Sequence, residues 1–396
     1  MKPSWHPTRE QEFLLEACLE PDDRAAAALR AWMESVDIQQ IDGGSYRLLP
    51  LLASRHSTVE AKPKVRALAK GTYRRTWYHN QLLLAEGGKV ASLLGAAGIP
   101  VMIIKGAALA LEYYRDPGAR PMDDIDLAVP LEFAGQAVEL MVAQGWAASV
   151  TPLKGTMSPG RIKGPGWSPG PRAIEAFDGR YFHVRHSHGF RNPKGLGIDL
   201  HWHVFQEDCD PDSDADTWAG ARPASGGPFP FLVPPAHEHL LLILAHAARW
   251  NPIPSIRWVA DAATLIKTSP RLEWENFLAA AVRRRRTCAA AELLSYLASR
   301  FHAEVPADII ELLAVHPDTK TSRPAYIRDV SRPNLLSGWT EICYLHRRYR
   351  SLREISPAAC PPGFSRFISG ILGAERPSQV MGYAVREGIR RLRGIR

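Results

Sequence analysis

Two carboxylates stand two residues apart in the segment DIDLAV, at Asp124 and Asp126. The segment alternates apolar and polar residues as a β-strand with two different faces does, so both carboxylates are expected on one face. A third aspartate, Asp199, has a similar apolar setting in GIDLHWH. Carboxylates that meet on adjacent strands repel one another, and a hard divalent cation removes this penalty. The pattern therefore predicts that Asp124, Asp126 and Asp199 are catalytic metal ligands.

The expected metal is Mg²⁺, because it prefers carboxylates together with the phosphate oxygens of a substrate. A metal ion held by these carboxylates would suit the binding of a nucleoside triphosphate. Two ions are expected, one to activate an attacking oxygen and one to hold the triphosphate and stabilise the leaving pyrophosphate. Mn²⁺ is the alternative metal. Asp199 would also be able to accept the proton of an incoming hydroxyl. The simpler interpretation of the aspartates is a strand end with surface carboxylates and arginine partners.

A Lys-Gly turn precedes the aspartates, at Lys105 and Gly106 after the β-branched run IPVMII. A helix is expected to follow the turn, and the first N–H groups of a helix attract phosphate. Gly106 would let the backbone approach a triphosphate, and Lys105 would add a positive charge. Arg120, four residues before Asp124, is predicted either to bind the triphosphate or to pair with the carboxylates. A solvated lysine is the simpler interpretation of Lys105.

The segment GIDLHWH also carries two histidines that alternate with Asp199, at His201 and His203. Period-two alternation places all three on one side of the expected strand. His201 is accordingly predicted to contact the nucleotide. Trp202 would face the opposite side and lie in the core.

The spacing of apolar residues predicts the helices and strands that must position these residues. Helical spacing runs through residues 8–35 and on to Gly98, and it returns from about residue 232. Between these parts, strands are predicted over 99–104, 124–129, 180–190 and 195–205, and helices over 107–115 and 130–145. The predicted fold class is α/β (α+β), with a small mixed sheet flanked by N-terminal and C-terminal helical regions.

Three regions are predicted along the chain. An N-terminal helical region covers 1–80, the core covers 81–232, and a C-terminal helical region with a basic tail covers 233–396. Residues 154–172, rich in Pro and Gly, are expected to be a loop inserted into the core.

The composition indicates the kind of partner and the compartment of the protein. The 396 residues include 49 Lys and Arg against 41 Asp and Glu, a net charge of +8 that suits an anionic partner. Five cysteines lie far apart without metal-site spacing, which is typical of free thiols in a reducing compartment. Neither a signal peptide nor an apolar run of membrane-spanning length is evident. A cytoplasmic protein without membrane contact is therefore expected.

Three ordered blocks resemble the uncharacterised bacterial nucleotidyltransferase family of the polymerase-β-type superfamily. They read IKGAALALEYYRDPGARPMDDIDLAV, GIDLHWHVF and HEHLLLILAHAARWNPIPSIRWVADAATLI, and they span roughly residues 80–270. The resemblance implies a nucleotidyltransferase core with metal ligands at Asp124, Asp126 and Asp199. The Gly-Ser turn that is usual in the superfamily is replaced here by Lys105-Gly106.

Downstream residues have weaker signals. His246 lies on an apolar helix and is more often a core histidine than a nucleotide contact. Arg249 and Arg257 are candidates for phosphate contacts. The run RRRR at 283–286 is either a solvated helix face or, with the C-terminal arginines, a patch for RNA or an acidic peptide.

The predicted function is transfer of a nucleoside monophosphate from an NTP, by default ATP, to an acceptor, with release of pyrophosphate. A small molecule, a peptide or a protein is favoured as acceptor. The first alternative is an enzyme that acts on RNA or tRNA ends, and the second is a non-catalytic module that binds a nucleotide or a partner.

Overall fold

A computed structural model describes residues 3–55, 61–148, 182–183, 185–206, 208–226, 229–251 and 256–331. It also describes residues 343, 345–347, 349–350, 353–354 and 363–371. The insert at 154–172 and the basic tail lie outside the described residues, so the predictions for both stay predictions.

The chain divides into two units in space. The first contains Met1–Ser92, Val101–Asp126 and Asp216–Arg332, and the second contains Leu93–Pro100, Leu127–Ala215 and Pro333–Arg396. The division passes through strand β2 (Ile125–Ala128), between Asp126 and Leu127. The two units are thus defined by contacts in space and not by order along the chain. The three regions expected along the chain remain a prediction.

Helices form the N-terminal part, as the apolar period predicts. They are α1 (Arg9–Leu19), α2 (Asp22–Ser35), α3 (Gly43–Tyr46), α4 (Leu49–Ser54) and α5 (Pro63–Ala96), with a short 3₁₀ turn at Ile38–Gln40. The first helix begins with a capping box, in which Thr8 and Gln11 each accept a hydrogen bond from the other's backbone N–H. This box satisfies N–H groups that have no partner within the helix.

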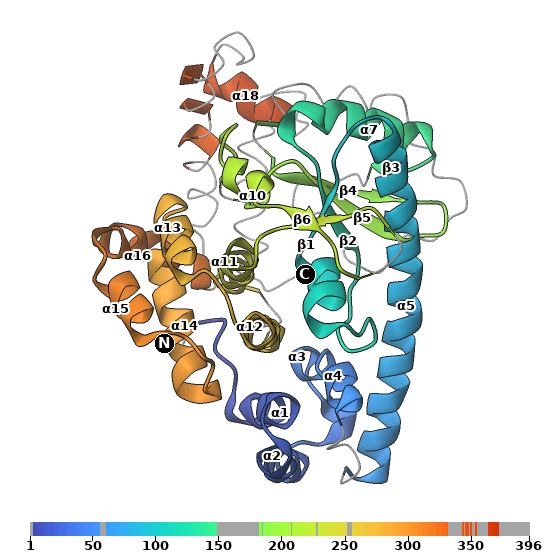
Figure 1. The fold of residues 1–396 in the computed structure, drawn as a ribbon, viewed down its shortest axis with the longest axis vertical. Coiled ribbons are helices and arrows are strands. Elements are labelled where there is room, and N and C mark those ends of the chain that lie inside the picture. The colour runs from blue at the N-terminus through green and yellow to red at the C-terminus, as the bar shows by residue number, and fades with distance from the viewer. Residues whose placement is uncertain are drawn as a thin grey trace. The chain divides into compact units, whose positions relative to one another are not determined.

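Helix α5, the long helix in Figure 1, packs closely on β2 and on the loop before it. Gly87 allows this approach, because a Cβ there would lie 2.5 Å from Cδ1 of Ile125. Asn80, fully buried on the same helix, donates hydrogen bonds to the carbonyl oxygens of Pro117 (2.6 Å) and Arg120 (2.7 Å). The helix therefore fixes the loop that leads into β2.

The strands form one seven-stranded sheet in the order β3-β4-β5-β2-β1-β7-β6. Besides β2 they are β1 (Met102–Ile104), β3 (Ala147–Ala148), β4 (Ser187–Arg191), β5 (Gly197–His201), β6 (Arg222–Pro223) and β7 (Leu232–Val233). Strand β1 pairs with β7 in parallel, whereas the pairs β3–β4, β4–β5 and β6–β7 are antiparallel. The predicted mixed sheet in an α/β fold is thus confirmed.

Strands β4 and β5 form a hairpin in which Gly189 faces Asp199. The turn between them uses Asn192, whose side chain accepts hydrogen bonds from the N–H groups of Lys194 and Leu196. Gly195 in this turn has a φ of 81°, which glycine adopts without strain. Both predicted strands therefore exist, although they are shorter than the apolar pattern suggests.

The helix expected over 107–115 begins earlier and changes type along its length. A short α6 (Lys105–Ala108) leads into a π-helix (Leu109–Tyr114), and Arg115 ends it with a φ of 53°. After β2, a 3₁₀ turn (Leu131–Phe133) continues into α7 (Ala134–Ala143), close to the predicted 130–145.

Helices follow again after β5, the first of them before β6 and the others after β7. They are α10 (Ala215–Ala219), α11 (Ala236–Ala247), α12 (Arg257–Thr268), α13 (Trp274–Arg283), α14 (Thr287–Phe301), α15 (Ala307–Val315), α16 (Pro317–Val330) and α18 (Phe364–Ile371). The helical pattern over 273–301 is broken after Arg283, where Arg285 has a φ of 52°. In the described part of the chain, none of the helices combines the length and the apolar character that crossing a bilayer requires.

Candidate metal centre

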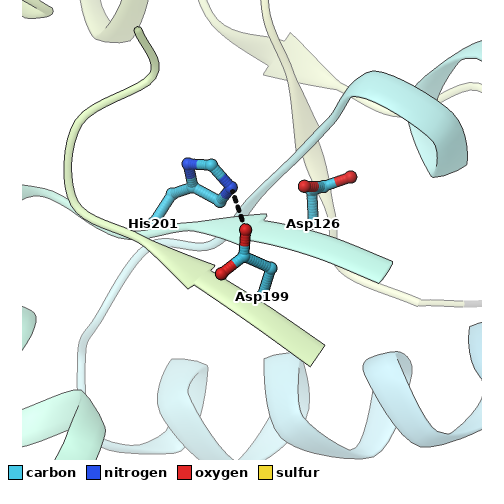
Figure 2. A group of neighbouring side chains, drawn as sticks. All are labelled: Asp126, Asp199 and His201. Carbon is cyan, nitrogen blue, oxygen red and sulfur yellow. Dashed lines mark ion pairs between the residues drawn. The ribbon is translucent and has the colours of Figure 1, made fainter. Parts of the chain in front are cut away.

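Two neighbouring strands bring three potential metal ligands together. Asp126 lies on β2, and Asp199 and His201 lie on β5, the next strand in the sheet. Each offers one ligand atom, and these atoms all lie within 4.8 Å of one another. Figure 2 shows the two carboxylates and the imidazole directed toward the same space beside the two strands, with the His201–Asp199 pair as a dashed line. Among the described residues, this is the one group of three or more such side chains that meets this distance.

The orientation of His201 shows which of its nitrogens can bind a cation. Its Nδ1 lies 3.2 Å from the carbonyl oxygen of His203, which accepts a hydrogen bond in the tautomer that has its proton on Nδ1. Its Nε2 lies 3.1 Å from Oδ2 of Asp199. A neutral imidazole in that tautomer presents a lone pair at Nε2, as the carboxylate does at Oδ2. A metal ion between Nε2 and Oδ2 would use both lone pairs, whereas a proton on Nε2 would be donated to Asp199.

The residues fit a divalent cation. Two carboxylates and one imidazole form a donor set that Mn²⁺ and other divalent metals accept, and the carboxylates suit Mg²⁺. Ser187 supports the set by donating a hydrogen bond from its hydroxyl to Oδ2 of Asp199, at 3.1 Å. His201 is fully buried, and the side chains of Asp126 and Asp199 are 12% and 24% exposed, so water and substrate can reach the carboxylates.

Lys105 lies next to this group. Its ammonium nitrogen is 2.7 Å from Oδ1 of Asp126. Its backbone has a φ of 49°, a left-handed conformation that is uncommon outside glycine. The following Gly106 is pressed against its surroundings, because a Cβ there would lie 2.7 Å from Nη1 of Arg120 and 3.3 Å from Met122. The predicted turn is therefore a tight corner that directs Lys105 toward Asp126.

Arg120 pairs with a carboxylate that lies far away in the sequence. Its Nε and Nη2 donate to the two oxygens of Asp261 on α12, at 2.8 and 2.9 Å, and Tyr114 donates to the same carboxylate at 3.0 Å. All of these polar groups lie in the protein interior. Burial acts to lower the pKa of Arg120 and to raise that of Asp261, but the neighbouring charges and the hydrogen bonds together outweigh burial and shift both pKa values in the opposite direction. Both groups are therefore charged.

Asp124 is not part of the group formed by Asp126, Asp199 and His201. It is exposed and stands one residue before β2, which begins at Ile125. Its neighbour Asp123 pairs with Arg47. A metal or catalytic role for Asp124 stays a prediction.

The second histidine of GIDLHWH has different surroundings. His203 lies beyond the end of β5, with Nε2 3.2 Å from the carbonyl oxygen of Phe182 and Nδ1 3.9 Å from Asp214. Trp202 is buried, as predicted, and its indole N–H donates to the carbonyl oxygen of Phe182.

Two of the basic residues singled out in the sequence, His246 and Arg257, have lowered pKa values. His246 is exposed. Desolvation by neighbouring protein atoms, followed by the charges of Arg249 and Lys105, lowers the pKa of its imidazole, so the ring is neutral near pH 7. Arg257 donates from Nη1 to the carbonyl oxygen of Pro121 at 2.6 Å. Desolvation and then the charge of Arg120 lower the pKa of Arg257 to about 10, which leaves it charged.

The basic run at 283–286 is engaged within the protein. Arg283 and Arg284 both contact the buried Glu238, at 2.6 and 3.2 Å. Arg286 lies 3.8 Å from Asp329. Arg284 is buried and therefore does not belong to a solvated face, whereas Arg283 is exposed. The acceptor patch stays a prediction.

A family model described as an uncharacterised nucleotidyltransferase matches residues 45–302. The matched range contains the strands that carry Asp126, Asp199 and His201, and also the Arg120–Asp261 pair. No curated protein and no solved structure matches the chain. The family match covers more than half of the 396 residues. The chain therefore belongs to this uncharacterised nucleotidyltransferase family.

Proposed function

We propose that the protein transfers a nucleoside monophosphate from a nucleoside triphosphate to an acceptor, with a divalent metal held by Asp126, Asp199 and His201. The observation that carries the proposal is the convergence of these three side chains on adjacent strands, within 4.8 Å. Family membership supplies the reaction class. Mg²⁺ is the expected metal, with Mn²⁺ as the alternative, and ATP is the default donor.

The charges around the group suit a triphosphate. Lys105 pairs with Asp126, and the charges of Lys105, Arg249 and Arg257 all act on His246. We assign Lys105 and the Gly106 backbone to phosphate binding. Arg120 instead positions the loop before β2, because Asp261 already occupies its guanidinium.

The proposed reaction exchanges one phosphorus–oxygen bond for another. The acceptor oxygen bonds to the α-phosphorus, the bond from that phosphorus to the β-phosphate oxygen breaks, and pyrophosphate leaves with the electron pair. A carboxylate of the group takes the proton of the acceptor hydroxyl. When bound, a divalent cation would supply the positive charge that offsets the triphosphate and the developing oxyanion. Ser187 holds Asp199 in place by the hydrogen bond from its hydroxyl.

A small molecule, a peptide or a protein remains the favoured acceptor. The RNA alternative relied on the run at 283–286 and on the C-terminal tail. Arg283 and Arg284 are paired with buried Glu238, so this run offers less charge to a nucleic acid than its sequence suggests.

A transfer assay tests the proposal. The protein is incubated with α-labelled NTPs and Mg²⁺, together with total RNA, a protein extract or a small-molecule extract. We expect label in the protein or small-molecule fraction. Asp126→Asn and Asp199→Asn should each lower transfer by about 100-fold or more, because even outer partners of metal ligands are worth 10–100-fold.

The matched control is Asp308→Asn, which neutralises an exposed carboxylate in the first turn of α15. It should transfer at the wild-type rate. Undiminished transfer by Asp126→Asn would contradict the assignment of the site. Label found only in RNA would show that the acceptor is RNA and not a small molecule, a peptide or a protein. Absence of NTP binding with Mg²⁺ present would favour a non-catalytic module that binds a partner.

A further inference from the structure

The ammonium group of Lys105 stands where a cation is needed. It lies 2.7 Å from Oδ1 of Asp126, and Asp126 also contributes an oxygen to the group with Asp199 and His201. Two carboxylates so close together repel each other unless positive charge lies near. In the protein alone, Lys105 supplies one such charge to Asp126.

The backbone holds Lys105 in this position at a cost. A non-glycine residue with a φ of 49° is in a sparsely populated region, and such residues persist where the surrounding structure fixes them. Here β1 enters the corner from one side, and Gly106 is pressed against Arg120 and Met122 on the other. The Arg120–Asp261 pair in turn holds that guanidinium in place. The fold therefore directs the side chain of Lys105 toward Asp126.

A divalent cation beside Lys105 would compete for the same carboxylate. The ammonium group of Lys105 pairs with Asp126, and a cation bound to that carboxylate would repel the ammonium group directly. A triphosphate offers both cations further negative charges to contact.

We propose that Lys105 is a counter-ion that changes partner: it pairs with Asp126 in the free protein and moves to the triphosphate when a metal binds. This inference rests on the proposed function. It gives Lys105 two effects of opposite sign. The residue weakens binding of the metal alone, and it strengthens binding of the metal together with a nucleotide. The protein would then accept its metal chiefly as a metal–nucleotide complex.

Calorimetry with Mn²⁺ alone tests the first effect. We expect Lys105→Met to bind Mn²⁺ about tenfold more tightly than wild type, because an ammonium group that competes with and repels the ion has been removed. Lys105→Arg keeps the charge and should bind as weakly as wild type. Lys89→Met is the matched control, since it removes a lysine that pairs with Glu86 at 2.9 Å on α5. Its Mn²⁺ affinity should equal that of wild type.

The second effect is measured with a non-hydrolysable ATP analogue in saturating Mn²⁺. Lys105→Met should bind the analogue about tenfold more weakly, since one phosphate contact is lost. A variant that bound Mn²⁺ no more tightly than wild type would overturn the partner exchange, even if it bound the analogue poorly. Lys105→Gln provides the same test if the methionine variant does not fold. Absence of Mn²⁺ binding by wild type and variants alike, with or without the analogue, would overturn the proposed function as well.

Discussion

The imidazole of His201 is held by a carbonyl on one nitrogen and faces a carboxylate with the other. Its Nδ1 points to the carbonyl oxygen of His203, and its Nε2 to Asp199. This is the arrangement of a metal-binding histidine, in which the second nitrogen fixes the tautomer. His201 could therefore ligate a cation, and its contact with the nucleotide stays a prediction.

His201→Leu should lower the affinity for Mn²⁺ by about 10-fold or more, because it removes one of three ligands and leaves the two carboxylates. Isothermal calorimetry measures the change. His237→Gln serves as the control, since His237 pairs with Glu273 and not with the carboxylates of the group. Equal affinity of wild type and the leucine variant would show that His201 only supports Asp199.

Asp261 balances a buried charge. Asp261→Asn leaves the guanidinium of Arg120 buried without its carboxylate, and loss of one partner of a buried pair costs about 3–5 kcal/mol. Asp123→Asn breaks the more exposed pair with Arg47, whose side chains are 76% and 43% exposed, and should cost about 0–1 kcal/mol. Urea unfolding compares the two variants. Equal effects would contradict a structural role for the buried pair.

At the scale of elements, the corner between β1 and α6 carries the most constraint. Gly106→Ala places a methyl group 2.7 Å from Nη1 of Arg120, which Asp261 prevents from moving freely. We expect a loss of about 1–3 kcal/mol, as for other overpacked sites. Gly71→Ala on α5 meets nothing within 4 Å and should instead stabilise the helix by about 0.5–1 kcal/mol.

Thermal unfolding of both glycine variants checks these signs. Similar stability of Gly106→Ala and wild type would mean that the corner can relax, and would remove the constraint on Lys105.

Local sequence patterns predicted many of the elements but not all of their contacts. The period of two in DIDLAV correctly located β2, but the strand begins at Ile125, so Asp124 falls just before the strand. The two-residue strands β6 and β7 are too short to show a period. The sequence across 273–301 reads as one continuous helix, because the arginines there have good helix propensity. The observed break comes from the backbone at Arg285, which has a positive φ.

The candidate site was predictable where it depended on local spacing. Asp126 and Asp199 were recognised from their apolar settings. Which residue joins them depends on how β2 and β5 lie side by side, and no local pattern specifies this. The partner of Arg120 lies 141 residues away, at Asp261, and Asn80 supports the same loop from α5. A polar residue inside the apolar face of a long helix was the available signal for Asn80.

At the scale of the whole molecule, a buried histidine links stability to pH. His239 on α11 is fully buried, and desolvation, followed by the charge of Arg120, lowers its pKa from 6.5 to about 4. Between these values the unfolded chain binds a proton that the folded chain does not bind. Stability therefore falls as the pH falls through this window, by about 3 kcal/mol in total for this group.

His239→Leu should reduce this loss. Urea midpoints of wild type and variant, measured at pH 7 and at pH 4.5, give the comparison. The variant should lose less stability on acidification than wild type does. A parallel loss in both proteins would assign the acid sensitivity to other groups.

The most direct test of the metal centre is anomalous X-ray diffraction at the manganese absorption edge, from crystals grown with Mn²⁺ and a non-hydrolysable nucleoside triphosphate. Manganese bonded to Asp126 and Asp199, with His201 as a third ligand and Lys105 at the phosphates, is the result that we predict. Manganese bound elsewhere in the protein, with Lys105 still paired to Asp126 beside a bound nucleotide, would contradict the account.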